Sequence, residues 1–161
     1  MKLTPKRLLI AVAVVVAALL AYFLFGGDDN SLPLKAQVTG TVNGAQASGT
    51  GVADAPFGSV RLSATGSGQF EANCVVFDGT GQLVTGAGTL QLSLPKPGRA
   101  CLTGSELEQA EAGGEVNVAA TIEATGTDGA LLGRHGRLKA RGTFNTSSGA
   151  FTVSLSGRLR R

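Results

Sequence analysis

From residue 34 onward, apolar and polar residues alternate along short runs that are separated by glycine-rich segments. Alternation with a period of two places apolar side chains on one face of a strand, so it predicts half-buried strands. The clearest run is at the C-terminus, where Phe151, Val153 and Leu155 alternate with Thr152 and Ser154. We therefore predict an all-β domain, and the other runs of this kind are Val60–Ala64, Leu90–Leu94, Val116–Ala124 and Leu138–Phe144.

Turn residues separate these runs. Asn43-Gly44, Asp78-Gly79 and Asp128-Gly129 supply glycines that accept the positive φ angles of tight hairpins. Ser147-Ser148-Gly149 predicts a further hairpin before the last strand. Roughly eight or nine strands result, and glycine inside strands permits the coiling that a small closed barrel requires. We predict an antiparallel β-barrel, with a β-sandwich as the alternative.

One segment departs from the alternation. Residues 105–114 (SELEQAEAGG) begin with Ser105 and Glu108 at the spacing of a capping box and end in two glycines. The segment predicts either one or two helical turns or an acidic, exposed loop.

A long apolar run precedes the β domain. Leu8–Phe25 has 18 residues and contains no charge, glycine or proline. A helix of this length covers about 27 Å, which is enough to cross the core of a bilayer. Lys2, Lys6 and Arg7 precede the run. The positive-inside rule therefore predicts a cytoplasmic N-terminus and an extracytoplasmic remainder.

The apolar run divides the chain into segments and predicts a single-pass protein of the cell membrane. The alternative is secretion after cleavage of a signal peptide, which has a similar basic start and apolar middle. Bulky Leu24 and Phe25 occupy positions where cleavage after the run requires small residues, which favours the uncleaved anchor. The predicted segments are a cytoplasmic basic flank at 1–7, a transmembrane signal-anchor helix at 8–25, a linker at 26–33 and an extracytoplasmic β domain at 34–161.

The formal net charge of +3 comes from the first of these segments. Three of the 14 basic residues precede the apolar run and all 11 acidic residues follow it, so the rest of the chain is electrically balanced. The net charge therefore gives no support to nucleic-acid binding, and the domain lacks the aromatic residues that would stack bases.

The basic residues of the domain gather near its C-terminus, where no acidic residue follows Asp128. Arg137, Lys139, Arg141 and Arg158 are a candidate contact for an anionic surface, because two paired strands would present them as one outward stripe. Such a stripe would attract anionic lipid headgroups, an acidic envelope polymer or a partner protein. The alternative is a solvated face that protects the edge of a sheet.

Cys74 and Cys101 are the only cysteines, and both follow the apolar run. In an oxidising compartment the simplest prediction is a disulfide between them, with two free buried thiols as the alternative. Closing a loop of about 28 residues would contribute about 3.5 kcal/mol on the chain-entropy model. His and carboxylate residues show no spacing that would complete a metal site, so we predict no metal and no cofactor.

The sequence supplies no catalytic constellation. His135 is the only histidine, and neither G-x-S-x-G nor H-E-x-x-H occurs, so we predict a solvent-exposed loop histidine. Glu71 and Glu123 lie in strand-like runs, where burial inside a barrel would raise their pKa values. Alternation places Glu123 on the outside and leaves the side of Glu71 open.

The run Gly126-Thr-Asp-Gly-Ala-Leu-Leu-Gly-Arg-His-Gly136, followed by Gly142-Thr-Phe144 and the last amphipathic strand, resembles the glycine-rich hairpins of allene oxide cyclase/dirigent-like β-barrels. The resemblance covers about the last 35 residues. It implies a barrel whose lumen binds apolar small molecules, and in some members guides cyclisation or coupling without a cofactor. No catalytic residue of that family falls on a position of this chain, and the domain lacks the Tyr and Trp that would stack on a ligand.

These observations favour a non-enzymatic protein over an enzyme. We expect a membrane-anchored extracytoplasmic β-barrel that acts as a binding or structural protein of the envelope. The alternative is a cofactor-free lumenal enzyme of the cyclase or isomerase kind, or a carrier of apolar small ligands. The alternative requires a lumen of about 300 Å³ or more.

Overall fold

A computed structural model describes residues 31–71, 74–101 and 103–161. This part of the chain contains nine strands, one α-helix and one 3-10 helix, and the all-β prediction is confirmed. The elements are β1 (Leu32–Asn43), β2 (Gln46–Ala53), β3 (Gly58–Glu71), β4 (Cys74–Thr85), β5 (Gly88–Ser93), β6 (Gly98–Cys101), α2 (Gly104–Glu111), β7 (Glu115–Gly126), η1 (Gly129–Leu131), β8 (His135–Asn145) and β9 (Ala150–Arg160).

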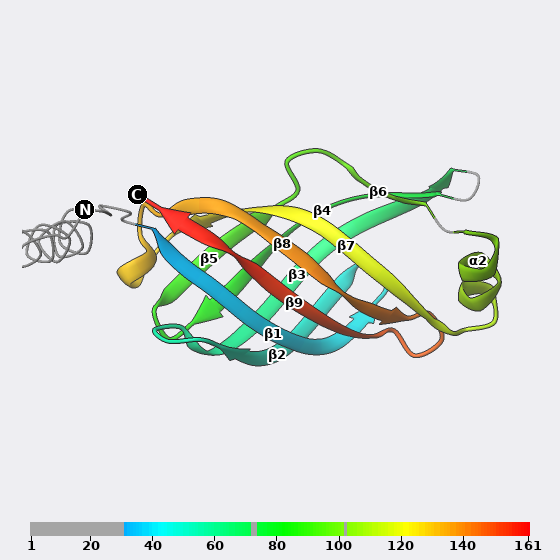
Figure 1. The fold of residues 1–161 in the computed structure, drawn as a ribbon, viewed down its shortest axis with the longest axis horizontal. Helices are drawn as coiled ribbons and strands as arrows, with labels where there is room; N and C mark the ends of the chain where they lie inside the picture. The colour runs from blue at the N-terminus through cyan, green and yellow to red at the C-terminus, as the bar shows by residue number, and fades with distance from the viewer. Residues whose placement is uncertain (1–30, 72–73, 102) are drawn as a thin grey trace, which may run out of the picture. The chain divides into compact units, whose positions relative to one another are not determined.

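Eight of the strands close into an antiparallel barrel (Figure 1). The hydrogen-bonded order is β3-β2-β1-β9-β8-β7-β5-β4, and β4 pairs with β3 to complete the ring. The short strand β6 lies outside this ring and pairs with the first residues of β4. The predicted barrel is confirmed, and the sandwich alternative is wrong because the sheet closes on itself.

Side chains along each strand point alternately into and out of the barrel. In β8, Leu138 and Ala140 are buried, whereas Arg137, Lys139 and Arg141 are exposed. The same alternation continues in β9, where the buried Leu155 lies opposite Ala140. The period-two pattern of the sequence is therefore confirmed, and it places the basic residues of β8 on the outer surface.

Two of the four predicted hairpin turns, at Asn43-Gly44 and Ser147-Ser148-Gly149, are confirmed, whereas Asp128-Gly129 lies in a longer connection that contains η1. Gly44, Gly129 and Gly149 have φ angles of 60°, 58° and 72°, which glycine adopts without strain. The prediction of a turn at Asp78-Gly79 is wrong, because both residues lie inside β4. Pairing with β3 continues through this point, so the ladder overrides the local turn preference.

The segment after β6 forms the helix α2, so the helical alternative is confirmed with a different cap. The N-cap is Thr103 rather than Ser105, and the capping box is completed by Glu106. The backbone N of Thr103 donates to Glu106 Oε2 at 2.9 Å. The hydroxyl of Thr146 donates to the carbonyl oxygen of Ala110 at 2.8 Å, which ties the helix to the β8–β9 hairpin. Both Thr103 and Ser105 have an acid three residues later, so spacing alone does not choose between them.

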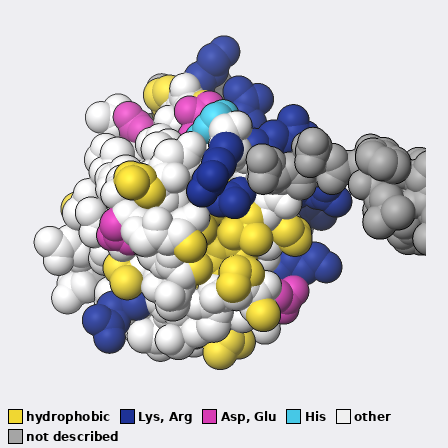
Figure 2. All heavy atoms as spheres, turned by 90° about the vertical axis from the view of Figure 1, so that its left-hand side faces the viewer, with side chains coloured by type: hydrophobic (Ala, Val, Ile, Leu, Met, Phe, Trp, Pro, Cys, Tyr) yellow, Lys and Arg dark blue, Asp and Glu magenta, His cyan; other side chains and the backbone are white. Residues whose placement is uncertain are grey.

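One half of the barrel lumen is filled, and we call it the packed half. It is the half next to Ser31 and Arg161, and Figure 2 looks onto its outer end, where apolar side chains gather with Lys and Arg around them. Full burial of a large apolar side chain contributes about 1.5–3 kcal/mol. The packed half is defined by the fully buried residues Leu34, Phe57, Leu83, Leu90, Leu131, Leu138 and Leu159.

The predicted flank at 1–7, the predicted transmembrane helix at 8–25 and most of the predicted linker lie outside the described residues. Among the helices that the structure does describe, none has the length and apolar character needed to cross a membrane. β1 begins at Leu32, inside the segment 26–33 that the sequence predicts as linker.

Candidate binding site

The half of the barrel away from Ser31 and Arg161 contains a cavity of about 400 Å³. We call this region the hollow half. Its inward-facing lining residues are aliphatic, aromatic or glycine, and all except Leu94, which follows β5, come from six of the eight barrel strands. They are Val42, Ala47, Leu62, Ala64, Gly66, Phe77, Gly79, Gly81, Leu92, Leu94, Ala120 and Ile122.

Small residues at inward positions of β3 and β4 leave this space open. Gly66 lies opposite Gly79, and Ala64 lies opposite Gly81. A Cβ atom on Gly66 or Gly79 would lie 2.8 Å from a backbone oxygen of the adjacent strand. Glycine at these positions therefore allows the two strands to approach closely, and it also removes the side chains that would fill the lumen.

Polar side chains near the cavity lie on the outer side of the wall. Thr65 and Thr80, which alternate with the inward glycines, are exposed. Asp78 is the one titratable residue among the described residues that line the cavity. Its side chain is exposed, and Asp78 Oδ1 accepts a hydrogen bond from the backbone N of Gly79 at 2.8 Å. The lumen is thus suited to an apolar molecule, and the described residues that line it provide no acid–base pair aimed at a bound molecule.

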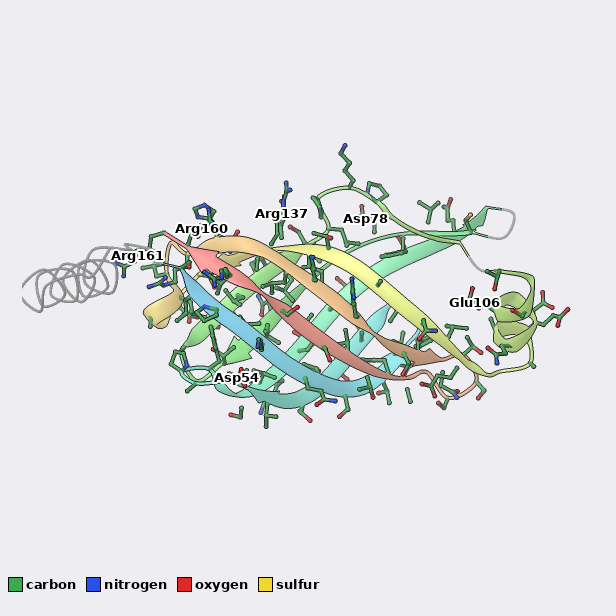
Figure 3. All side chains as sticks on the ribbon, viewed as in Figure 1. Asp54, Asp78, Glu106, Arg137, Arg160 and Arg161 are labelled. Atoms are coloured by element: carbon green, nitrogen blue, oxygen red, sulfur yellow. The ribbon has the colours of Figure 1, made fainter. Side chains whose placement is uncertain are left out.

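The predicted basic residues share one outer surface over β8 and β9. Arg137, Lys139 and Arg141 are exposed in β8, and Arg158 of β9 lies directly opposite Arg137. Figure 3 shows Arg137 pointing away from the barrel. Its Nη2 is 3.5 Å from Glu123 Oε1, in an ion pair between partly exposed side chains. The register and exposure of the four residues are compatible with one outward stripe, and contact with an anionic surface stays a prediction.

The two cysteines lie opposite each other at the far end of the hollow half. Cys74 of β4 is the register partner of Cys101 of β6, and Cys74 is buried. Directly opposite residues of antiparallel strands have Cα separations of about 4.5–5.5 Å, within the range that a disulfide spans. The side chain of Cys101 lies outside the described residues, so the sulfur–sulfur bond stays a prediction that the register supports.

The remaining titratable candidates do not form a site. His135 is exposed at the start of β8, and Glu123 lies on the outer surface as predicted. The side chain of Glu71 lies outside the described residues. The pKa of Glu106 is lowered mainly by a hydrogen bond from the backbone of Thr103 and secondly by one from the Thr103 side chain. Glu106 therefore belongs to the cap of α2. In the described part of the chain, His, Cys, Asp and Glu form no group of three that would hold a metal ion.

Comparison of the chain with protein-family models, curated proteins and solved structures finds no match. The residues that resemble allene oxide cyclase/dirigent-like barrels form the end of β7, η1, β8 and β9. That resemblance stays a prediction.

Sequence reasoning missed the cavity, although the sequence contains a signal for it. Gly66-Ser-Gly68 and Gly79-Thr-Gly81 repeat glycine with a period of two. Within a strand, that spacing leaves one face without side chains. Two such strands side by side predict an unfilled lumen, once their pairing is known.

Proposed function

We propose that the protein is a membrane-anchored, extracytoplasmic β-barrel that binds an apolar small molecule in its hollow half without acting on it chemically. The observation that carries this proposal is the apolar cavity of about 400 Å³ inside a closed barrel. Small-molecule sites have volumes of about 300–1,000 Å³ and are mostly apolar, so the cavity is large enough to serve as one.

The lining supports binding more than catalysis. Removing apolar surface from water stabilises a complex by about 25 cal/mol per Å² before the costs of association. Continuous ladders join β1, β2, β3 and β4 around the cavity, so a ligand enters a space that already exists. A lumenal cyclase or isomerase would need an acid or base beside its substrate, and the titratable Asp78 on this wall points to solvent.

The membrane part of the proposal depends on the sequence. The apolar run at 8–25 and its basic flank favour a single-pass anchor with the barrel outside the cytoplasmic membrane. A short linker would then hold the barrel close to a bilayer, which is a reservoir of apolar molecules. The proposed Cys74–Cys101 disulfide belongs to the same oxidising compartment and would fix β6 on β4 at the end of the hollow half.

The test uses the full chain in phosphatidylcholine nanodiscs and an uncharged monoacylglycerol that bears a diazirine on its acyl chain. After illumination, mass spectrometry quantifies the label on peptides from residues 31–161. We expect saturable labelling of the wild-type barrel. Ala64→Phe should abolish most of it, because Ala64 lines the cavity and the larger side chain would occupy the space.

Ser63→Phe is the matched control, because Ser63 is the adjacent residue of β3 and is exposed on the outer surface. It should keep wild-type labelling. Equal labelling of the two variants, or no saturable labelling of the wild-type barrel, would contradict the proposal.

A further inference from the structure

A groove lies on the outer surface beside the cavity. It has a volume of about 640 Å³ and runs over β7 and β8, next to the segment that follows β5. We call it the basic groove, because its lining includes Lys96, Arg137, Lys139 and Arg141.

The basic groove and the lumenal cavity meet at a break in the barrel ladder. Pairing between β5 and β7 ends at Ser93 and Glu123. Among the described strands, the part of β7 before Glu123 has β8 as its one ladder partner. Phe77, Leu94 and Ala120 lie at this break, and all three line both the cavity and the groove. An apolar seam therefore separates the lumen from the basic outer surface.

The charges along the groove are only partly neutralised. Glu123 pairs with Arg137 at 3.5 Å. In the described part of the chain, Lys96, Lys139 and Arg141 have no carboxylate within ion-pairing distance. The β7 residues opposite Lys139 and Arg141 are Thr121 and Ala119, which carry no charge. Three cations thus lie on the outer side of the apolar seam that borders the cavity, and they favour an anionic group there.

We propose that the ligand is a single-chain lipid with a phosphate headgroup, with its acyl chain in the hollow half and its phosphate in the basic groove. This inference rests on the proposed function and names the class of ligand. The groove has a volume of about 640 Å³, and its cations come from two parts of the chain, the segment after β5 and β8. A tetrahedral phosphate offers several anionic oxygens to such a set, whereas a carboxylate offers two in one plane.

The experiment compares three diazirine probes with the same acyl chain on the full chain in phosphatidylcholine nanodiscs. The probes are a lysophosphatidic acid, the monoacylglycerol that lacks its phosphate, and the free fatty acid. The measured quantity is the concentration that gives half-maximal labelling of barrel peptides. We expect this concentration to be about tenfold lower for the lysophosphatidic acid than for the other two probes, because the phosphate accepts charge-assisted hydrogen bonds from the groove; tenfold corresponds to about 1.4 kcal/mol.

The double variant Lys139→Gln/Arg141→Gln should raise the half-labelling concentration of the lysophosphatidic acid about tenfold and leave that of the monoacylglycerol unchanged. Lys35→Gln/Arg61→Gln is the matched control, because both residues are exposed barrel cations that do not line the groove. It should leave all three values unchanged. An unchanged thermal melt of each double variant shows that the fold is intact.

Several results would overturn this inference and leave the proposed function standing. Equal values for the lysophosphatidic acid and the monoacylglycerol would show that the groove does not select an anion. A half-labelling concentration for the fatty acid as low as that for the lysophosphatidic acid would show that the groove accepts any anionic headgroup and does not select phosphate. If the Lys35→Gln/Arg61→Gln control lost the preference for the lysophosphatidic acid over the monoacylglycerol, the headgroup site would lie outside the basic groove. Absence of barrel labelling by every probe would overturn the proposed function as well.

Discussion

The packed half and the hollow half of the barrel share the same strands, yet their lumens are filled differently. In β3 and β4, Leu62 lies opposite Leu83, and two residues further along Ala64 lies opposite Gly81. Leu83 is fully buried in the packed half, whereas Ala64 lines the cavity. A single pair of strands thus supplies core at one end and space at the other.

This difference separates stability from binding along the barrel axis. Close-packed side chains in the packed half hold the eight strands together, so the hollow half can keep an unfilled lumen. The unfilled lumen costs little folding free energy, because its glycine and alanine residues have little apolar surface that packing could bury. Four sets of variants would break or sharpen the comparison, and each uses the full chain in nanodiscs with pulse proteolysis in urea as the measure of unfolding free energy.

The largest difference is expected between two phenylalanines. Phe57→Ala should lower the free energy of unfolding by about 3–5 kcal/mol, because Phe57 is fully buried in the packed half. Phe77→Ala should lose less than half as much, because Phe77 is only partly buried and borders both the cavity and the basic groove. Equal losses would show that the two halves are packed alike.

The second prediction concerns the end of the hollow half. Cys74→Ser should lower the free energy of unfolding by about 3.5 kcal/mol if the predicted disulfide closes its loop. Cys101→Ser should cost the same, and the double variant should cost no more than either one, because a disulfide requires both sulfurs. Additive losses would instead indicate two separate thiols.

Enlarging an alanine should have opposite effects in the two halves. Ala124 is 1% exposed and packs in the core cluster, so Ala124→Leu should lower the free energy of unfolding by about 1–3 kcal/mol through overpacking. Ala64→Leu places the same side chain in the cavity and should leave stability unchanged or raise it. A loss at Ala64 as large as that at Ala124 would mean that the cavity has no room for a guest.

The smallest effect is expected in α2, which belongs to neither half. Thr103→Ala should cost about 0.5–2 kcal/mol through loss of the N-cap and should leave lumenal labelling unchanged. The pKa of Glu106 is lowered by its bonds from Thr103, so its stabilising contribution is complete above its ordinary pKa of 4.5 and is lost as the pH falls through the lowered value. The stability difference between wild type and Glu106→Gln should therefore be present at neutral pH and vanish in acid. A difference that persists in acid would contradict the capping role.

The sequence predicts the barrel better than it predicts the site, and particular residues show why. Alternation in β8 identifies Leu138 as buried and Lys139 as exposed, because one face of the strand must leave water. Asp78-Gly79 has the composition of a turn, but pairing with β3 decides its conformation. The cavity depends on which inward residues face each other, as Gly66 and Gly79 do. That information belongs to the register of distant strands, which local patterns do not contain.

The central claim is that the hollow half takes up an apolar guest. A crystal structure of the full chain, grown in a lipidic mesophase that contains bromodecanol, would locate the bromine by anomalous scattering. We expect a bromine peak in the lumen among Leu62, Phe77 and Ile122, where the cavity lies. A lumen closed by its own side chains, with bromine found only outside the barrel, would contradict the claim.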